Sequence, residues 1–236
     1  MPAHSASRDD HRSYARFMTA PIVTVRGQAQ LEVPPDLATL SFTVHSAGDT
    51  AEQTRAELAE ASGRIRDLLS EHASAIERSS TSGLHVAPVF SRRSGTKITG
   101  FRGSFSTQVV VHDFDALSGI VFALTPLPNS QIDGPWWSLR PDNAAYRTVR
   151  LEAIADARRR ADDYAAAFGA SVIDLAEVSD LEPGFAAPRE MRAFGMARDM
   201  AEEPVFEFEP ATQTVSGQVT VRFTISTPDL RVASEQ

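Results

Sequence analysis

The sequence predicts an α+β protein: an antiparallel sheet with helices, including one long alanine-rich helix, packed on one face. Three observations predict this class. Several segments alternate apolar and polar residues with a period of two, which is typical of half-buried strands. Other segments repeat apolar residues at helical spacing, and they are intermixed with the strands along the chain. Clean alternation favours antiparallel pairing with one solvated face, and intermixed elements favour a layered α+β arrangement.

The first two strands are expected to follow each other directly. Residues 23–33 and residues 38–44 both alternate with a period of two. Pro34-Pro35-Asp36, which lies between them, has the composition of a turn. We therefore expect the two segments to pair as an antiparallel hairpin, with one face on a core and the other in water.

A helix is expected after this hairpin. Thr50 followed by Gln53 matches a capping box, in which the two side chains satisfy free backbone N–H groups at the helix start. Leu58, Ile65 and Leu68 recur at helical spacing behind it. Further elements are expected as strands at 84–90, 98–112 and 131–139, with a short helix at 115–124.

The longest predicted helix begins at Pro141-Asp142 and ends at Gly169, which suits the position after a helix C-terminus. Many residues of its apolar stripe are alanines, so the helix can lie close against a sheet. Strands near 172–179 and at 215–225 follow it. The stripe consists of Tyr146, Val149, Ala153, Ala157, Ala161, Tyr164 and Phe168.

Charged residues on this helix are expected to form a solvated face rather than a catalytic pair. Two acidic residues follow three arginines at a spacing of four, which suits ion pairs along a helix. The expected pairs are Arg158 with Asp162 and Arg159 with Asp163.

The chain is expected to form a single domain over residues 21–228. Residues 1–20 have the composition of a disordered leader, with Met18 as an alternative start, and residues 229–236 are expected to be a disordered tail. Residues 183–212 contain four prolines and no clear periodicity, which predicts a mobile excursion that is either functional or disordered.

The composition excludes several classes of function. The absence of cysteine removes disulfides, thiolate metal sites and cysteine nucleophiles. The net charge of −8 disfavours nucleic acid and anionic membranes as partners. No segment approaches the ~20 apolar residues of a membrane span, and no apolar signal region is present, so a cytoplasmic location is expected.

No established catalytic or nucleotide-binding motif occurs, so we expect no enzyme activity, no catalytic residue and no cofactor. A metal site formed by His45, His85 and His112 would require neighbouring strands and converging rings. Solvated histidines on strands are the simpler interpretation, and no metal site is expected.

The local basic residues are Arg92, Arg93, Lys97 and Arg102. A solvated hairpin tip is one interpretation of this cluster, and a weak ligand-binding or anion-binding site is the other. The two remain open at this point.

Large apolar residues indicate a possible subunit interface. Trp136 and Trp137 are adjacent on a predicted strand, so one indole faces the core and the other needs cover. Phe206 and Phe208 make the 183–212 excursion more apolar than a simple linker, so it could dock on a partner subunit. We expect a homo-oligomer, which must be held by non-covalent contacts.

Four blocks of the sequence together resemble the SIMPL-domain family. They are VRGQAQLEVPPDLATLSFTVHSAGDTAEQ, TSGLHVAPVFSRRSGTKITGFRGSFSTQVVVHDFD, LEAIADARRRADDYAAAFGA and VSGQVTVRFTIS. The resemblance extends over about residues 21–227, in order. It carries no catalytic motif, and the Trp136-Trp137 pair departs from the smaller residues expected near that strand.

The resemblance implies a protein of uncharacterised role, of a family whose bacterial members are often periplasmic and sometimes linked to oxidative-stress defence. One immunogenic member resembles a builder of ring-like oligomers. We therefore expect a non-enzymatic, self-assembling protein. The alternative is a small-ligand-binding protein or an enzyme with a cleft beside the sheet, using His45, His85, Arg92 and Arg102.

Overall fold

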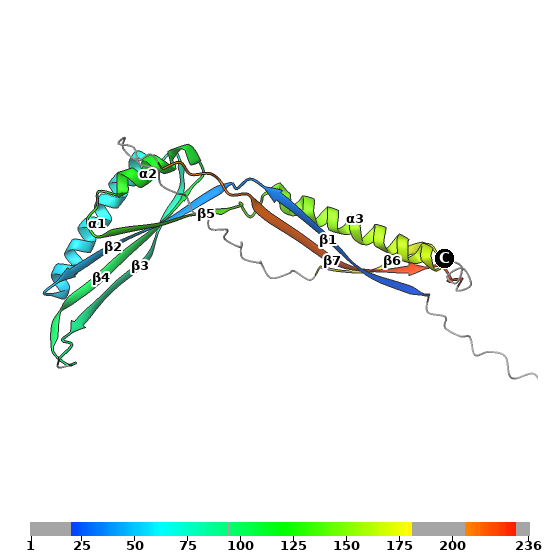
Figure 1. The fold of residues 1–236 in the computed structure, drawn as a ribbon, viewed down its shortest axis with the longest axis horizontal. Coiled ribbons are helices and arrows are strands. Elements are labelled where there is room, and N and C mark those ends of the chain that lie inside the picture. Colours follow the sequence, from blue (N-terminus) through cyan, green and yellow to red (C-terminus); the bar gives the residue numbers. More distant parts are fainter. Residues whose placement is uncertain (1–19, 94, 181–205, 230–236) are drawn as a thin grey trace, which may run out of the picture. The chain divides into compact units, whose positions relative to one another are not determined.

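The computed structural model describes residues 20–93, 95–180 and 206–229, and it confirms the α+β class (Figure 1). The described chain divides into two compact units. One contains residues 20–29, 148–180 and 216–229, and the other contains residues 30–93, 95–147 and 206–215. The strands are β1 (Ile22–Val33), β2 (Leu37–Gly48), β3 (Ile76–Phe90), β4 (Ile98–Val111), β5 (Ser130–Ser138), β6 (Val172–Ser179) and β7 (Gln213–Ile225). The helices are α1 (Ala51–Glu71), the short η1 (Phe114–Ala116), α2 (Leu117–Leu124) and α3 (Ala144–Ala167).

The strands form two sheets, where the sequence predicted one. The first has the order β1-β7-β6 and the second β3-β4-β2-β5. The predicted hairpin of residues 23–33 with 38–44 is therefore wrong, because β1 pairs with β7 whereas β2 pairs with β4 and β5. Alternation determines which face of a strand is buried, but not which strand lies beside it. Residues 1–19 of the predicted leader, 230–236 of the predicted tail and 183–205 of the predicted excursion lie outside the described residues, and the domain limits stay predictions.

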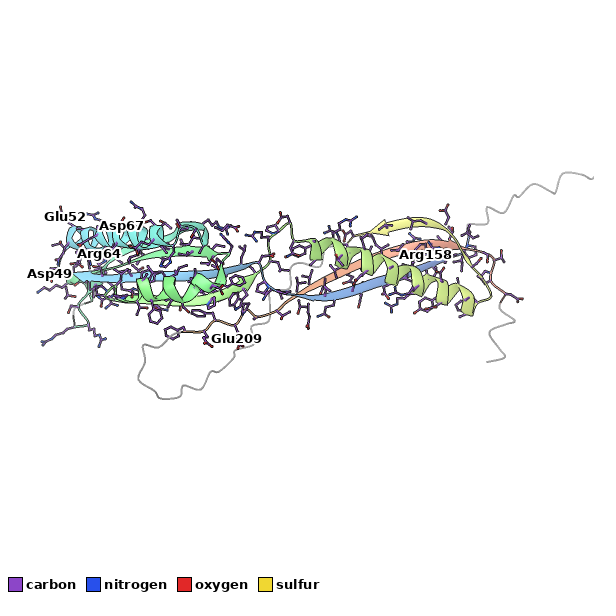
Figure 2. The ribbon with its side chains drawn as sticks, turned by 90° about the horizontal axis from the view of Figure 1, so that it is seen from above. Asp49, Glu52, Arg64, Asp67, Arg158 and Glu209 are labelled. Carbon is purple, nitrogen blue, oxygen red and sulfur yellow. The ribbon has the colours of Figure 1, made fainter. Side chains whose placement is uncertain are left out.

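The four-stranded unit has α1 and α2 on one face of its sheet (Figure 1). Thr50 caps α1 by accepting the N–H of Gln53 at 3.1 Å. The Gln53 side chain donates to Glu57 instead of returning to Thr50, so only half of the predicted capping box forms. Glu52, Arg64 and Asp67 lie on the solvated side of α1 (Figure 2). The largest fully buried apolar side chains of this unit are Leu40, Phe42, Leu58, Ile65, Val109, Val111, Leu117, Ile120 and Leu124.

The three-stranded unit is built on a close approach between α3 and its sheet. A Cβ atom on Gly27 of β1 would lie 1.9 Å from the carbonyl oxygen of Ala153 and 2.7 Å from the Cβ of Ala157. A Cβ on Gly217 of β7 would lie 2.8 Å from the carbonyl oxygen of Val149. Only glycine fits at these two strand positions, because the helix backbone occupies the space that a side chain would need.

The buried stripe of α3 differs at its C-terminal end from the predicted one. Tyr164 and Phe168 were expected in the stripe, but both are exposed. The buried side recurs strictly at every fourth residue, and this row drifts around the helix relative to the 3.6-residue repeat, so the last turn buries an alanine instead. The buried residues are Ala145, Val149, Ala153, Ala157, Ala161 and Ala165.

Hydrogen bonds to the Asp36 side chain connect the turn after β1 to the segment that precedes α3. The Asp36 Oδ2 accepts the backbone N–H of Arg140 at 2.8 Å and the side-chain amide of Asn143 at 2.7 Å. The Asn143 side chain in turn accepts the N–H of Ala145, and α3 begins at Ala144 rather than at the predicted Pro141-Asp142. Desolvation raises the pKa of Asp36, but these two hydrogen bonds and the charge of Arg140 together lower it below its ordinary value.

We expect Gly27→Ala to destabilise the protein by about 2 kcal/mol or more, because overpacking displaces a helix whose backbone lies in the way. Gly63→Ala is the matched control, since nothing lies within 4 Å of a Cβ at this position in α1. Alanine there should stabilise by up to ~1 kcal/mol through helix propensity. Urea unfolding followed by circular dichroism measures both, and equal effects would contradict the close approach.

We expect Asp36→Ala to lower the free energy of unfolding by roughly 1–3 kcal/mol at pH 7, because two donors lose their acceptor. The lowered pKa means that the ionised carboxylate stabilises the fold above the unfolded aspartate value of about 3.9. This contribution is lost as the pH falls through the lower folded value. The difference between wild type and variant should therefore shrink below about pH 4. Asp67→Ala, on the exposed face of α1, serves as the control in the same urea titrations, and a difference independent of pH would refute the assignment.

Candidate functional site

The open face of the four-stranded sheet carries a row of three polar residues. His45 of β2 and His85 of β3 both lie directly opposite Ser104 of the central strand β4. Residues directly opposite each other share a face, so the three side chains point to the same side. Adjacent strands lie ~4.8 Å apart, which places the two histidine Cα atoms roughly 10 Å from each other with Ser104 between them.

This row lies on the side of the sheet that α1 and α2 leave uncovered. Gly103 faces α1, because a Cβ there would lie 2.8 Å from Leu58 and 3.0 Å from Thr54. Its neighbours Arg102 and Ser104 therefore face the opposite way. His45, His85 and Arg102 are all exposed.

Arg102 lies one row further along β4, at about 6.6 Å from Ser104 by strand geometry. Its partners on the two adjacent strands are Ala47 and Ala87. Because both neighbours are small, the sheet surface is hollowed around the guanidinium group. The hollow has a volume of about 350 Å³ and is lined by His45, His85, Ala87, Pro88, Val89, Arg102, Gly103 and Ser104.

The lining of this hollow has one sign of charge. It contains one guanidinium group, two imidazoles and one hydroxyl, and no carboxylate. Among residues 20–93, 95–180 and 206–229, no carboxylate forms an ion pair with Arg102. The hollow is therefore a surface with several hydrogen-bond donors and an unneutralised cation.

The structure separates Arg102 from the three other basic residues that the sequence groups with it. Arg92 and Arg93 lie in the turn that joins β3 to β4, where Ser91 N–H donates to the carbonyl oxygen of Lys97 at 2.8 Å. Arg102 lies within β4, about 13 Å along the strand from the start of β4. Anion binding by the four stays a prediction, but only Arg102 lines the hollow.

The three histidines considered for a metal site do not come together. His45 and His85 share the row opposite Ser104, whereas His112 follows the far end of β4. In the described part of the chain, no three His, Cys, Asp or Glu residues are grouped to hold a metal ion. The α3 ion pairs follow the sequence prediction in one case. Arg158 lies 3.6 Å from Asp162, as predicted, but Arg159 pairs with Asp156 at 3.3 Å rather than with Asp163.

The two tryptophans of β5 face opposite sides of the sheet. Trp137 lies opposite Ala38 and packs on the core, with its ring 4.9 Å from that of Phe114 in an edge-on arrangement. Trp136 lies opposite Thr39 on the open face and is 41% exposed. An interface at Trp136 stays a prediction.

The segment that contains Phe206 and Phe208 lies against α2 of the same chain. The Phe206 ring lies 6.0 Å from that of Phe122, and its carbonyl oxygen accepts a hydrogen bond from the Ser118 hydroxyl. Phe208 packs against the core, whereas Phe206 remains half exposed. Docking of this segment on a partner subunit stays a prediction.

The three-stranded unit exposes an apolar strip on β6. Leu175 lies opposite Phe223, and Val178 lies opposite Val221, so both point to the side of the sheet that α3 occupies. Their partners on β7 are buried, yet Leu175 is 53% and Val178 is 51% exposed. We call Leu175 and Val178 the β6 ledge.

The three-stranded unit also has a smaller apolar hollow beside α3 and β1. Its volume is about 210 Å³, and it is lined by Ile22, Val23, Thr24, Tyr164, Ala165, Phe168 and Ile225.

Ser104 and the two alanines beside Arg102 were missed in the sequence. The period of two places Arg102 and Ser104 on one face of their strand, and this signal was present. The register that brings His45 and His85 to Ser104 joins three segments from different parts of the chain, and no local pattern contains it.

One antiparallel sheet carries α1 and α2 on one face and the other carries α3, and together they define an α+β protein. The chain belongs to the SIMPL family, whose model, described as a protein of unknown function (DUF541), matches residues 23–223. No curated protein matches this chain. None of the helices formed by the described residues has the length and apolarity of a membrane span.

We expect Trp137→Ala to destabilise the protein by roughly 2–4 kcal/mol, because it removes a half-buried indole from the core. Trp136→Ala should cost less than about 1 kcal/mol, because its indole lies on the open face. The two adjacent tryptophans are matched controls for each other in urea unfolding. A larger loss for Trp136→Ala would contradict the assignment of the two faces.

Proposed function

We propose that this protein is a non-enzymatic, self-assembling member of the SIMPL family, and that its copies associate through β6. The single observation that carries this proposal is the β6 ledge. Two aliphatic side chains lie there on the helix-covered side of a sheet, directly beside buried partners, and are more than half exposed. Burying such side chains is worth about 25 cal/mol per Å² of apolar surface.

The backbone of β6 supports the same proposal. In the order β1-β7-β6 this strand is at an edge of its sheet, and within the described residues no strand pairs with its outer side. An edge strand presents free N–H and C=O groups that pair readily with another strand. A second copy supplies an identical edge, and an isologous contact would place the two ledges side by side.

A second copy is favoured over an unrelated partner, because a single contact between two β6 strands pairs the free backbone groups of the edge and also buries the exposed side chains of the ledge. Antiparallel pairing of two β6 strands would continue the sheet and join the two apolar strips between two copies of α3. The ion pair between Glu177 and Arg222, with 2.9 Å between Oε2 and Nη1, already neutralises one β6 carboxylate. A link to stress defence and a cytoplasmic location remain parts of this proposal that follow from the resemblance and from the sequence.

We expect the full chain to be a homo-oligomer at roughly 50 μM, by light scattering after size exclusion and by native mass spectrometry. Leu175→Lys should convert it to the monomer, because an ammonium group buried in an interface costs several kcal/mol. Leu84→Lys is the matched control. Leu84 also lies on the helix side of an edge strand and opposite a phenylalanine, Phe105, and it is likewise exposed.

A wild-type chain that is monomeric at this concentration, and is unchanged by deletion of residues 183–212, would refute self-assembly. An oligomer that Leu84→Lys dissociates and Leu175→Lys does not would place the interface elsewhere and contradict the role of β6.

A further inference from the structure

We propose that the hollow on the open face of the four-stranded sheet binds the phosphate group of a small organic phosphomonoester. This inference does not depend on self-assembly. It rests on the donors that three adjacent strands bring to one place, namely His45, His85, Ser104 and Arg102.

Arg102 supplies the charge for this ligand. A guanidinium group offers planar, paired donors that match two oxygens of a phosphate. Among the described residues no carboxylate pairs with Arg102, and none lines the hollow. An anion entering the hollow therefore does not have to displace an existing ion pair.

The row of His45, Ser104 and His85 supplies further donors beside the guanidinium group. A neutral imidazole has one N–H donor and a protonated one has two, while the serine hydroxyl can rotate to donate. The two histidines flank Ser104 at roughly 5 Å on either side. A tetrahedral group above Ser104 is therefore within reach of donors from three strands, with Arg102 one row away.

The remaining lining explains why the ligand carries an organic group. Ala87 and Val89, which point to the open face from β3, provide an apolar side of the hollow. A volume of about 350 Å³ exceeds what a bare phosphate ion fills and lies at the lower end of the range for small-molecule sites. The organic part of a phosphomonoester can cover these apolar side chains, whereas a free phosphate ion would leave them exposed to water.

The same residues are unsuited to a metal ion. The two histidines lack a third ligand of metal-binding type, since the described residues contain no group of three such side chains. The positive charge of Arg102 within the same hollow repels a cation. The chemistry of the lining thus favours an anion over a metal.

Phenyl phosphate is the probe that tests this proposal, titrated into the full chain at constant ionic strength. We expect saturable binding with a Kd on the order of 1 mM or tighter, measured by calorimetry. In imidazole ¹H–¹⁵N spectra, the signals of His45 and His85 should shift, and those of His72 and His112 should not. Inorganic phosphate should compete more weakly, and phenol should not bind.

Arg102→Gln should weaken the binding of phenyl phosphate roughly tenfold or more, because a charge-assisted contact is lost. Arg92→Gln, in the β3–β4 turn, is the matched control and should leave the Kd unchanged. If Arg102→Gln does not fold, the wild-type imidazole spectra still decide, because they report the site directly.

Three results would overturn the proposal. The first is no binding of phenyl phosphate up to ~20 mM, which corresponds to an interaction too weak to be specific. The second is binding that shifts neither His45 nor His85, or that Arg92→Gln weakens as much as Arg102→Gln. The third is sedimentation with phosphatidate vesicles, but not with phosphatidylcholine vesicles, in the absence of binding to the soluble probe, which would indicate a lipid headgroup site.

Discussion

The close approach of α3 to its sheet is the constraint on which the three-stranded unit depends. Two strand glycines, Gly27 and Gly217, and the alanines that face them let the helix backbone come within van der Waals distance of the strands. The helix packs on β1 and β7, where the glycines lie, and its cluster includes Val172 at the start of β6. Further along β6, Leu175 and Val178 lie on the same side of the sheet and are more than half exposed.

The four-stranded unit uses the alternation of its strands for two purposes. In β2, Leu40, Phe42 and Val44 point to α1 and α2 and are buried, while His45 points to the other side. Gly103 and Ser104 divide β4 in the same way, since the glycine admits α1 and the serine faces the hollow. The covered face thus supplies the stability, and the open face is free to carry polar side chains at fixed spacings.

The sequence predicts most elements of this fold, because each strand and helix carries its own local pattern. The limits of β6 are predicted to the residue, and β5 and α2 to within two residues. The start of β3 was missed: the strand begins at Ile76 rather than at residue 84, because residues 76–83 show no clean alternation of apolar and polar residues. The partners of the strands are not local, which is why the 23–33 segment was paired with the wrong neighbour. Trp136 and Trp137 were correctly expected on opposite faces, since alternation alone decides it.

The candidate site could be predicted only in part, for the same reason. His45, His85 and Arg102 were all identified by residue type. Their positions along the chain, however, do not reveal that the two histidines flank Ser104. Arg92 seemed to belong with Arg102 because ten residues separate them, yet the extended strands carry the two to different places. Proximity in a sheet is set by register, and register follows from the burial of a whole strand face rather than from any one residue.

The two surfaces on which the proposals rest differ in the interaction that would stabilise a bound partner. The β6 ledge gains free energy by removing apolar surface from water, so its partner must be apolar and must fit its shape. The hollow at Arg102 gains free energy from oriented donors, and it loses part of that gain to the hydration of the anion, so it suits a small ligand of moderate affinity. The ledge and the hollow are formed by different residues in different compact units, so a substitution in one removes no side chain of the other. The two proposals can therefore be tested with separate variants.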